Sequence, residues 1–430
     1  MNPEPPRSST RLRRTVAGAV AMVAVGAVAV VWLVAGDEPR PTTTLVAPAT
    51  APVIEEPRLA LAAAPAASAA EDVRVESPGE VQMCGGAWVK LKDDGDVDWD
   101  SVAAASRESS DALAASVASA MASSADEHAR AAALVIALPA SLPLRVKPPS
   151  CDGDAACERE LKVAQEWVER RDALAKLAQD SSDPTVYSWA VQACSVANKD
   201  EAGNCQLISP AQWARLDPSN AAPWIAVAMK ARAEKDAAAL DDALFRISVA
   251  ERYDPGEYEV SRVLLDHVPD SESNLWGALM LVVQGLAFNS SAAAGDLQAL
   301  AMLCAAKDLT PEDARREACE RSAEMLLKSS TTLNGLVAGR MIGKRVGWPQ
   351  ERIDRLQKES GALQTARTRA SPTGAESVGC KAVRAQLDNA REFAAEGVVA
   401  ALRRRASEAP VRTVASTSLR SATPGSVPPR

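Results

Sequence analysis

The chain begins with a long apolar segment. Residues 15–36 carry no charged side chain, and at about 1.5 Å of rise per residue a helix of this length spans the roughly 30 Å hydrocarbon core of a bilayer. Arginines precede the segment and acids follow it, which favours an N-terminus inside and a remainder outside. We expect an uncleaved transmembrane signal anchor at 15–36 behind a short cytoplasmic tail at 1–14. A cleaved signal peptide is the alternative, disfavoured because the apolar segment is too long for one.

Polar, proline-rich stretches flank the rest of the chain. Residues 37–80 are rich in Pro, Ala and Thr and contain few large apolar side chains, which indicates an extended linker. Residues 406–430 have a similar character, and we expect them to form a disordered tail. The folded domain is therefore predicted at 81–405.

Apolar residues at helical spacing, separated by prolines and capping residues, predict a series of helices in this domain. The predicted helices cover residues 101–124, 125–138, 155–179, 184–196 and 210–216, and the sequence Thr310-Pro311-Glu312-Asp313 starts another. No comparable series of strands is present in the pattern. The predicted fold class is therefore all-α.

Glycines recur at every fourth position at Gly335, Gly339, Gly343 and Gly347. On a helix they form one face without side chains, against which another backbone can pack closely. Because each glycine costs a helix about 1 kcal/mol relative to alanine, the pattern indicates a packing role. Contact with a neighbouring helix of the same chain is favoured over a groove for a partner.

Residues 220–255 carry a repeat-like pattern. An aromatic residue and small residues in a first segment precede small and apolar residues in a second: Trp224, Val227, Ala228 and Ala231, then Ala243, Ile247, Ala250 and Pro255. With three extra residues allowed between the segments, the pattern resembles a tetratricopeptide repeat, a helix–turn–helix unit of about 34 residues. It departs from that family where Ala228 and Ala231 replace a glycine and a tyrosine. A weaker copy lies at 183–218, and the resemblance implies a helical-repeat domain of a kind that mostly binds proteins.

The eight cysteines form an even set, which behind an export segment indicates disulfides in an oxidising compartment. Their spacing favours three local pairs and one long closure: Cys151–Cys157, Cys194–Cys205, Cys304–Cys319 and Cys84–Cys380. Cys304–Cys319 fits least well, because helices that meet between the two residues can place their Cα atoms more than about 7 Å apart. A zinc site is the less favoured alternative, since the sequence lacks Cys-x-x-Cys and both histidines lie far from any cysteine.

Aspartates alternate at Asp96, Asp98 and Asp100. Carboxylates spaced in this way begin a calcium-binding loop, whose hard oxygen ligands converge on the ion. The pattern then fails, because Ser101 stands where the loop needs glycine and Arg107 where it needs a bidentate glutamate. An acidic turn that caps the next helix is therefore favoured over a calcium site.

The sequence contains no complete catalytic or cofactor-binding motif. His128 and His267 adjoin acids, but residues one position apart point to different faces of a helix, so neither histidine is expected to form a catalytic pair. The net charge of −8 argues against nucleic acid as a partner. The main basic run starts at 403–405 and is interpreted as a solvated tail rather than a lipid-binding site.

These features together predict a single-pass protein of a bacterial inner membrane with a periplasmic, disulfide-linked helical domain. The bacterial assignment rests on the alanine-rich composition, although Asn289-Ser290-Ser291 matches a glycosylation sequon. The expected function is a protein-binding adaptor or an envelope assembly factor, tethered by its N-terminal helix. The alternative is a periplasmic enzyme of the hydrolase type, with a site assembled from several helices.

Overall fold

The structure of the chain is a computed structural model. The described residues are 79–136, 155–195, 203–305, 314–369 and 372–408. The expected anchor lies outside these residues, as do the helix start at 310–313, the expected linker up to residue 78 and the expected tail from residue 409. Both expected boundaries of the folded domain were wrong by a few residues, because a strand begins at Glu80 and a helix continues to Glu408. Within the described ranges, no helix is long and apolar enough to cross a membrane.

The described residues form an all-helical fold apart from one short β hairpin. In chain order the elements are β1 (Glu80–Gln82), β2 (Trp88–Lys90), α2 (Trp99–Ala122), α3 (Glu127–Ile136), α4 (Ala155–Gln179), α5 (Pro184–Ser195), η3 (Gly203–Leu207), α6 (Pro210–Leu216), α7 (Ala221–Glu234), α8 (Ala237–Val249), α9 (Glu259–Leu265), η4 (Glu272–Asn274), α10 (Leu275–Leu303), α11 (Ala314–Ser329), α12 (Leu333–Arg345), α13 (Gln350–Arg369), η6 (Gly374–Val378), α14 (Cys380–Glu396) and α15 (Val398–Glu408). The all-α prediction is confirmed in this coarse sense.

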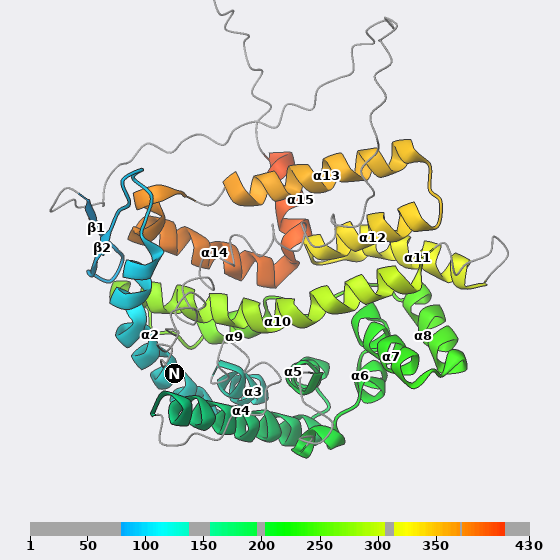
Figure 1. Ribbon diagram of the computed structural model, residues 1–430, viewed down its shortest axis with the longest axis horizontal. Helices are drawn as coiled ribbons and strands as arrows, with labels where there is room; N and C mark the ends of the chain where they lie inside the picture. The colour runs from blue at the N-terminus through cyan, green and yellow to red at the C-terminus, as the bar shows by residue number, and fades with distance from the viewer. Residues whose placement is uncertain (1–78, 137–154, 196–202, 306–313, 370–371, 409–430) are drawn as a thin grey trace, which may run out of the picture.

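The helices form a ring around α10 (Figure 1). From α2 to α8, each helix contacts the next one along the chain; α8 then contacts α11, and the ring continues through α12, α13, α15 and α14. Inside it, α10 contacts α2, α3, α5, α7, α12 and α14, together with the short α9. In Figure 1, helices α3 to α7 lie below α10, and α11 to α15 lie above it. Most of the apolar surface of α10 is therefore covered from several sides.

A disulfide closes the ring between its two ends. Cys84, in the hairpin that precedes α2, is bonded to Cys380 at the start of α14, with 4.5 Å between the Cα atoms and 296 residues between them in sequence. A backbone hydrogen bond from Cys84 N to Val378 O, 2.8 Å long, accompanies it. We call the Cys84–Cys380 bond the ring-closing disulfide.

Two apolar clusters fill the interior. The larger cluster lies among α2 to α8 and the helices α9 to α12, and includes the fully buried side chains of Trp189 and Leu300. The smaller cluster joins the hairpin to α10, α14 and α15 through residues such as Val81, Trp276 and Phe393. The hairpin is thus held to the C-terminal helices by apolar packing as well as by the ring-closing disulfide.

Local capping chemistry sets several helix starts. Asp183 Oδ1 accepts hydrogen bonds from Thr185 N (2.7 Å) and Val186 N (3.2 Å) at the start of α5. Ser209 caps α6, whose first residue is the expected proline. The start of α2 differs from the prediction, because the cap is Asp98 and the helix begins at Trp99. Similarly, α3 begins at Glu127, two residues later than predicted.

The hairpin is an element that the sequence pattern did not predict. β1 and β2 are three residues each and pair antiparallel, with Val81 opposite Val89 and both side chains buried. Gly85 and Gly86 connect them with φ angles of 98° and 91°, which side chains rarely adopt. Strands this short contribute too few alternating positions to stand out beside long helices.

The glycine face of α12 packs inside the chain, as favoured from the sequence. A Cβ atom on Gly339 would lie 2.9 Å from Ala323 O of α11, and one on Gly343 would overlap the ring of Trp348. The helix ends at Arg345, so Gly347 lies beyond it, with a φ of 88°. The fourth glycine therefore serves a turn and not the helix face.

The basic run at 403–405 lies on α15 and not in a solvated tail, so that interpretation was wrong. Arg404 and Arg405 both pair with Glu392, and Arg404 also binds Glu396 at 2.8 Å. Arg403 binds a glutamate of α13 at 2.8 Å. These glutamates neutralise the arginines within the fold.

Candidate functional site

The acidic turn before α2 uses its carboxylates to order the backbone. Asp98 Oδ1 accepts from Asp100 N at 3.2 Å as the cap of α2, and Asp96 Oδ1 accepts from Val97 N at 3.0 Å. In the part of the chain that the structure describes, no three acid, histidine or cysteine side chains gather as metal ligands. The capping role favoured from the sequence accounts for this turn.

The described cysteines are paired as their spacing favoured. Besides the ring-closing disulfide, Cys194 is bonded to Cys205 and Cys304 to Cys319, with Cα separations of 5.4 and 5.7 Å. The concern about the last pair was wrong, because Cys304 directly follows α10 and meets Cys319 on α11 at close range, both fully buried. The side chains of the expected pair Cys151–Cys157 lie outside the described residues.

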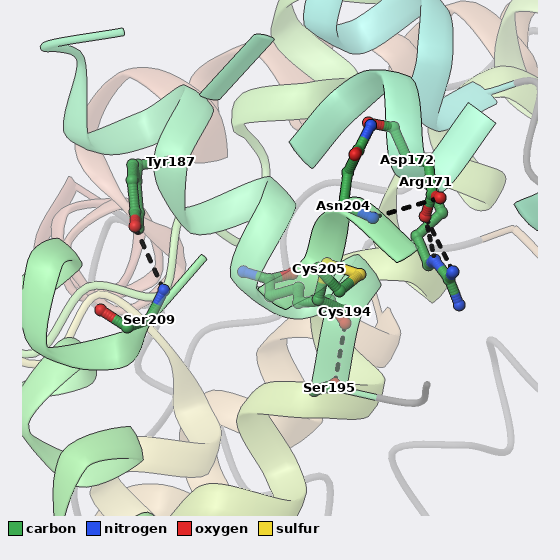
Figure 2. The surroundings of a disulfide bond; sticks show 9 residues. Arg171, Asp172, Tyr187, Cys194, Ser195, Asn204, Cys205 and Ser209 are labelled. Carbon is green, nitrogen blue, oxygen red and sulfur yellow. Dashed lines mark hydrogen bonds and ion pairs between the residues drawn. A yellow bond between two sulfur atoms is a disulfide. The ribbon is translucent and has the colours of Figure 1, made fainter. Parts of the chain in front are cut away.

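The surroundings of Cys194–Cys205 hold η3 in place (Figure 2). Asp172 of α4 accepts a hydrogen bond from Asn204 N at 3.2 Å, and its backbone oxygen accepts one from Asn204 Nδ2 at 3.1 Å. Arg171, fully buried, donates to Asp172 Oδ1 at 3.0 and 2.8 Å. These polar groups bind one another, so the arrangement anchors a connection between α4, α5 and η3.

The α7–α8 hairpin occupies the region that resembles a tetratricopeptide repeat. Lys235, at a left-handed φ of 59°, and Asp236, the cap of α8, form the connection between the helices. The expected packing positions Ala228, Ala231 and Ile247 are buried. However, α8 packs next against α11 and not against the following helix α9. The sequential array that the resemblance implies is therefore not continued after α8.

The two Asp-Pro endings of the repeat-like units lie side by side. Asn220 Nδ2 donates to Asp217 Oδ2 at 3.0 Å and to Asp254 O at 2.7 Å, while its Oδ1 accepts from Asp254 N at 3.0 Å. Arg252 binds both carboxylate oxygens of Asp217, at 2.8 and 2.9 Å. The neighbouring Tyr253 forms a parallel bridge with Ser330. The connections between α6 and α7, between α8 and α9 and between α11 and α12 thus hydrogen-bond to one another.

The following segment, Tyr253 to Tyr258, lies beside Asp296 of α10, and together they bring two buried tyrosines close to two partly buried acids. Burial raises the pKa of Glu257, against the opposing charge of Arg367, and raises the pKa of Asp296 on α10 to about 6. Burial and then the nearby charge of Asp296 raise the pKa of Tyr253. Arg367 donates to Tyr258 Oη at 3.2 Å, and burial is the main cause that raises the Tyr258 pKa to about 12. We call Tyr253, Glu257, Tyr258 and Asp296 the acid–tyrosine cluster.

Two buried amides hold the backbone of this segment. Asn289 Nδ2 donates to Gly256 O at 2.8 Å, and Gln192 Nε2 donates to Pro255 O at 3.4 Å. The Oδ1 of Asn289 and the Oε1 of Gln192 are buried and have no hydrogen-bond partner. The two amides therefore fix the backbone on which Glu257 and Tyr258 lie.

His128 forms acid contacts that the sequence did not predict. Its Nε2 lies 3.2 Å from Asp183 Oδ2 and its Nδ1 lies 3.6 Å from Asp126 Oδ1. Because Asp183 also caps α5, the histidine links α3 to the start of that helix. His267 differs: its Nδ1 lies 2.8 Å from the backbone oxygen of Val263, one turn earlier. The His128 contacts thus join two helices, whereas the His267 contact lies at the end of α9.

An exposed apolar pair lies on α8. Phe245 and Val249 are 52% and 50% exposed, more than any other large apolar side chain of the described residues. They lie one helical turn apart, so both belong to one face. Beside them, the guanidinium of Arg246 lies 5.6 Å from the ring centre of Trp224 on α7. The hairpin thus presents a small apolar face with a charged border, which we call the α8 apolar face.

A cavity opens beside the ring-closing disulfide. It has a volume of about 360 Å³. Both bonded cysteines contribute to its lining, with neighbours from the hairpin and from η4: Gln82, Met83, Cys84, Gly85, Gly86, Glu272, Ser273 and Cys380. Nothing in the sequence pattern indicated this cavity, because hairpin, η4 and α14 meet only in the fold.

Comparisons with known proteins identify no relative. No family model matches the chain. Neither a curated protein nor a solved structure matches it. Its function is therefore argued from the ring, the disulfides and the surfaces described above.

Proposed function

We propose that this chain is an exported, membrane-tethered adaptor whose helical ring binds a partner protein at the outer face of a bacterial inner membrane. The α8 apolar face is the observation that carries this proposal. Full burial of a phenylalanine or valine side chain contributes roughly 1.5–3 kcal/mol. Two such side chains half exposed on one face therefore favour covering by an apolar segment of a partner.

The borders of the α8 apolar face favour a specific fit. Asp242 pairs with Arg246 at 3.5 Å, and Asp241 pairs with Arg315 of α11 at 2.5 Å, so charged groups flank the apolar residues. An apolar centre with a polar border is the arrangement of protein–protein interfaces. The partner we propose presents an apolar side chain to Phe245 and Val249.

The disulfides support the proposed compartment. Three disulfides within the described residues are typical of proteins from oxidising compartments, such as the bacterial periplasm. The apolar segment at 15–36 then supplies both export and the tether, with residues 37–80 as the linker. This part of the proposal rests on the sequence together with the disulfides.

Site-specific crosslinking in intact cells tests the adaptor function. A photo-reactive amino acid at position 245 or 249 is expected to trap the same partner, whereas the same group at Val163, an apolar residue 43% exposed on α4, is expected to trap none. Phe245→Ser and Val249→Ser are expected to lower partner recovery at least about ten-fold, with Val163→Ser as the matched control. Equal recovery with all three variants, or no crosslink from 245 and 249, contradicts the proposal.

Membrane fractionation tests the tether separately. The full-length chain is expected to stay in the membrane fraction after an alkaline wash, with its original N-terminus intact. A soluble chain whose N-terminus begins inside or just after the segment at 15–36 would show a cleaved signal peptide instead.

The hydrolase alternative has one observation in its favour, the raised pKa values of Glu257 and Asp296. Against it, the cavity beside the ring-closing disulfide is lined by other residues, so cavity and shifted acids do not coincide. If Glu257→Gln and Asp296→Asn abolished the cellular function while crosslinking from position 245 persisted, the hydrolase would replace the adaptor.

A further inference from the structure

The ring-closing disulfide differs from the other two described disulfides in its surroundings. Cys304 and Cys319 are fully buried in the larger apolar cluster. Cys194–Cys205 lies partly exposed, against the Asp172–Asn204 contacts described above. The ring-closing disulfide instead lies at a cavity of about 360 Å³, to which both of its cysteines contribute. A molecule in that cavity meets the disulfide directly.

Cys380 is the more accessible of the two cysteines at this cavity. Gly85 and Gly86 form one border and place no side chain over the disulfide. Opposite them lie Ser273 and Glu272, both exposed. Of the two cysteines, Cys84 is only 2% exposed and Cys380 is partly exposed. Attack on a disulfide requires access to one sulfur, which here is that of Cys380.

We propose that Cys84–Cys380 is a thiol–disulfide exchange site at which an external thiol opens the helical ring. In the first step, the thiolate attacks Cys380 Sγ, a new S–S bond joins it to Cys380, and Cys84 leaves as a thiolate that takes up a proton. In the second step, a second thiolate attacks the external sulfur of the mixed disulfide and releases Cys380 as a thiolate. Two external thiols are oxidised to one disulfide, and the protein disulfide is reduced to two thiols.

The two bonded cysteines have different polar neighbours. Cys380 is the first residue of α14, and the free N–H groups of a helix N-terminus attract an anion such as the incoming thiolate. Cys84 Sγ lies 3.8 Å from Glu272 O, so the released thiol finds a carbonyl acceptor. The attacked and leaving sulfurs are thus placed in different environments.

Opening the disulfide removes the covalent link between the ends of the ring without removing its cores. The hairpin keeps its apolar contacts through Val81, Val89 and Val97 in the smaller cluster. The hydrogen bond from Cys84 N to Val378 O also joins the hairpin to the segment before α14. The expected product is a folded protein in which the hairpin still packs against α14 but opens locally more often than in the oxidised protein.

Graded redox buffers test the proposal on the native protein. In glutathione buffers, followed by alkylation and peptide mass spectrometry, Cys84 and Cys380 are expected to become labelled at least about ten-fold faster than Cys304 and Cys319. Circular dichroism is expected to stay unchanged, and amide exchange is expected to rise in residues 79–98. Earlier reduction of Cys304–Cys319, or reduction only with global unfolding, overturns the proposal.

A trapping experiment distinguishes a small thiol from a protein dithiol as the source. One arm uses glutathione alone; the other uses a protein dithiol oxidoreductase whose second cysteine is replaced by serine, which halts the reaction at the mixed disulfide. Either adduct is expected on Cys380, and the faster arm identifies the source. An adduct on Cys84, or none in either arm, contradicts the assignment.

A charge variant tests whether the reaction takes place in the cavity. Glu272→Gln is expected to speed reduction by glutathione about two- to three-fold and reduction by 2-mercaptoethanol by less, because the carboxylate repels the glutathione thiolate, with its additional negative charge, more strongly than the singly charged 2-mercaptoethanol thiolate. Glu351→Gln, at an exposed position on α13, is the matched control. Equal rates for Glu272→Gln and the control with glutathione would place the attack elsewhere. The proposal is independent of the adaptor function, since none of these readouts uses a partner.

Discussion

At the level of single residues, Asp296 is a carboxyl group placed where its charge is disfavoured. Burial raises its pKa from 3.8 to about 6, so the folded protein holds the proton more tightly than the unfolded chain does. Ionisation therefore costs stability as pH rises from about 4 to about 6, and the loss stays constant above that range. A change of this size corresponds to at most about 3 kcal/mol.

Asp296→Asn is expected to remove this pH dependence. The variant should match the native protein near pH 3.5 and exceed its free energy of unfolding by about 1–3 kcal/mol near pH 7.5. Urea denaturation of the oxidised proteins at the two pH values measures the difference. Asp111→Asn, on the exposed face of α2, is the control and is expected to change little at either pH. A variant less stable than the native protein near pH 7.5 would show that the carboxylate has a stabilising role.

At the level of elements, the contact between α11 and α12 depends on the absence of a side chain. Gly339 allows α12 to approach the backbone of α11 at Ala323, and also adjoins Leu326 and Leu327. On α13, Gly361 has open space around the same position, with no atom within 4 Å of an added Cβ. The two helices therefore offer a matched pair of glycines, one packed and one not.

Substitution of these glycines by alanine is expected to have opposite effects. Gly339→Ala should lower the free energy of unfolding by about 1–3 kcal/mol, because α11 and α12 must move apart. Gly361→Ala should raise it by about 0.5–1 kcal/mol through helix propensity alone. Chemical denaturation measures both. Stabilisation by Gly339→Ala would mean that α12 is not held against α11 as described.

The helices could be predicted from the sequence where their ends depend on local chemistry. The predicted boundaries of α6 agree with the structure because Ser209 and Pro210 specify its start. Helix α2 was placed two residues late because three neighbouring aspartates offer similar caps and only the fold selects Asp98. The hairpin escaped prediction because its strands are defined by each other and by Cys84, not by their own three residues.

At the scale of the whole molecule, the ring depends on contacts between distant segments. Helix α8 meets α11 and not α9, and the hairpin meets α14. The cysteine spacing did predict the Cys84–Cys380 closure, since these two remained after the close pairs were assigned. The acid–tyrosine cluster could not be predicted, because Glu257 lies in the segment before α9 and Asp296 on α10, and the two come together only in the fold. The α8 apolar face could have been recognised in the sequence, because Phe245 and Val249 are apolar residues on the side of the helix opposite Leu244 and Ile247, which are buried.

Removal of the ring-closing disulfide is expected to cost more stability than removal of a local one. Loop-closure entropy gives about 6 kcal/mol for a loop of 296 residues and about 3 kcal/mol for one of 11. Replacing Cys84 and Cys380 by serine should thus lower the unfolding free energy further than replacing Cys194 and Cys205. Urea denaturation of the two double variants provides the comparison. Equal losses would indicate that the unfolded chain already keeps the ends of the ring together.

The same bond decides how the protein responds to mechanical tension. If tension acts between the chain before Cys84 and the chain after Cys380, the force passes through the S–S bond and bypasses the 296-residue separation between the two cysteines. While the bond is intact, the chain between them is not stretched. Once a thiol cleaves it, up to roughly 1,000 Å of chain becomes available for extension. The disulfide therefore makes the extension of the stretched chain depend on the supply of reducing equivalents.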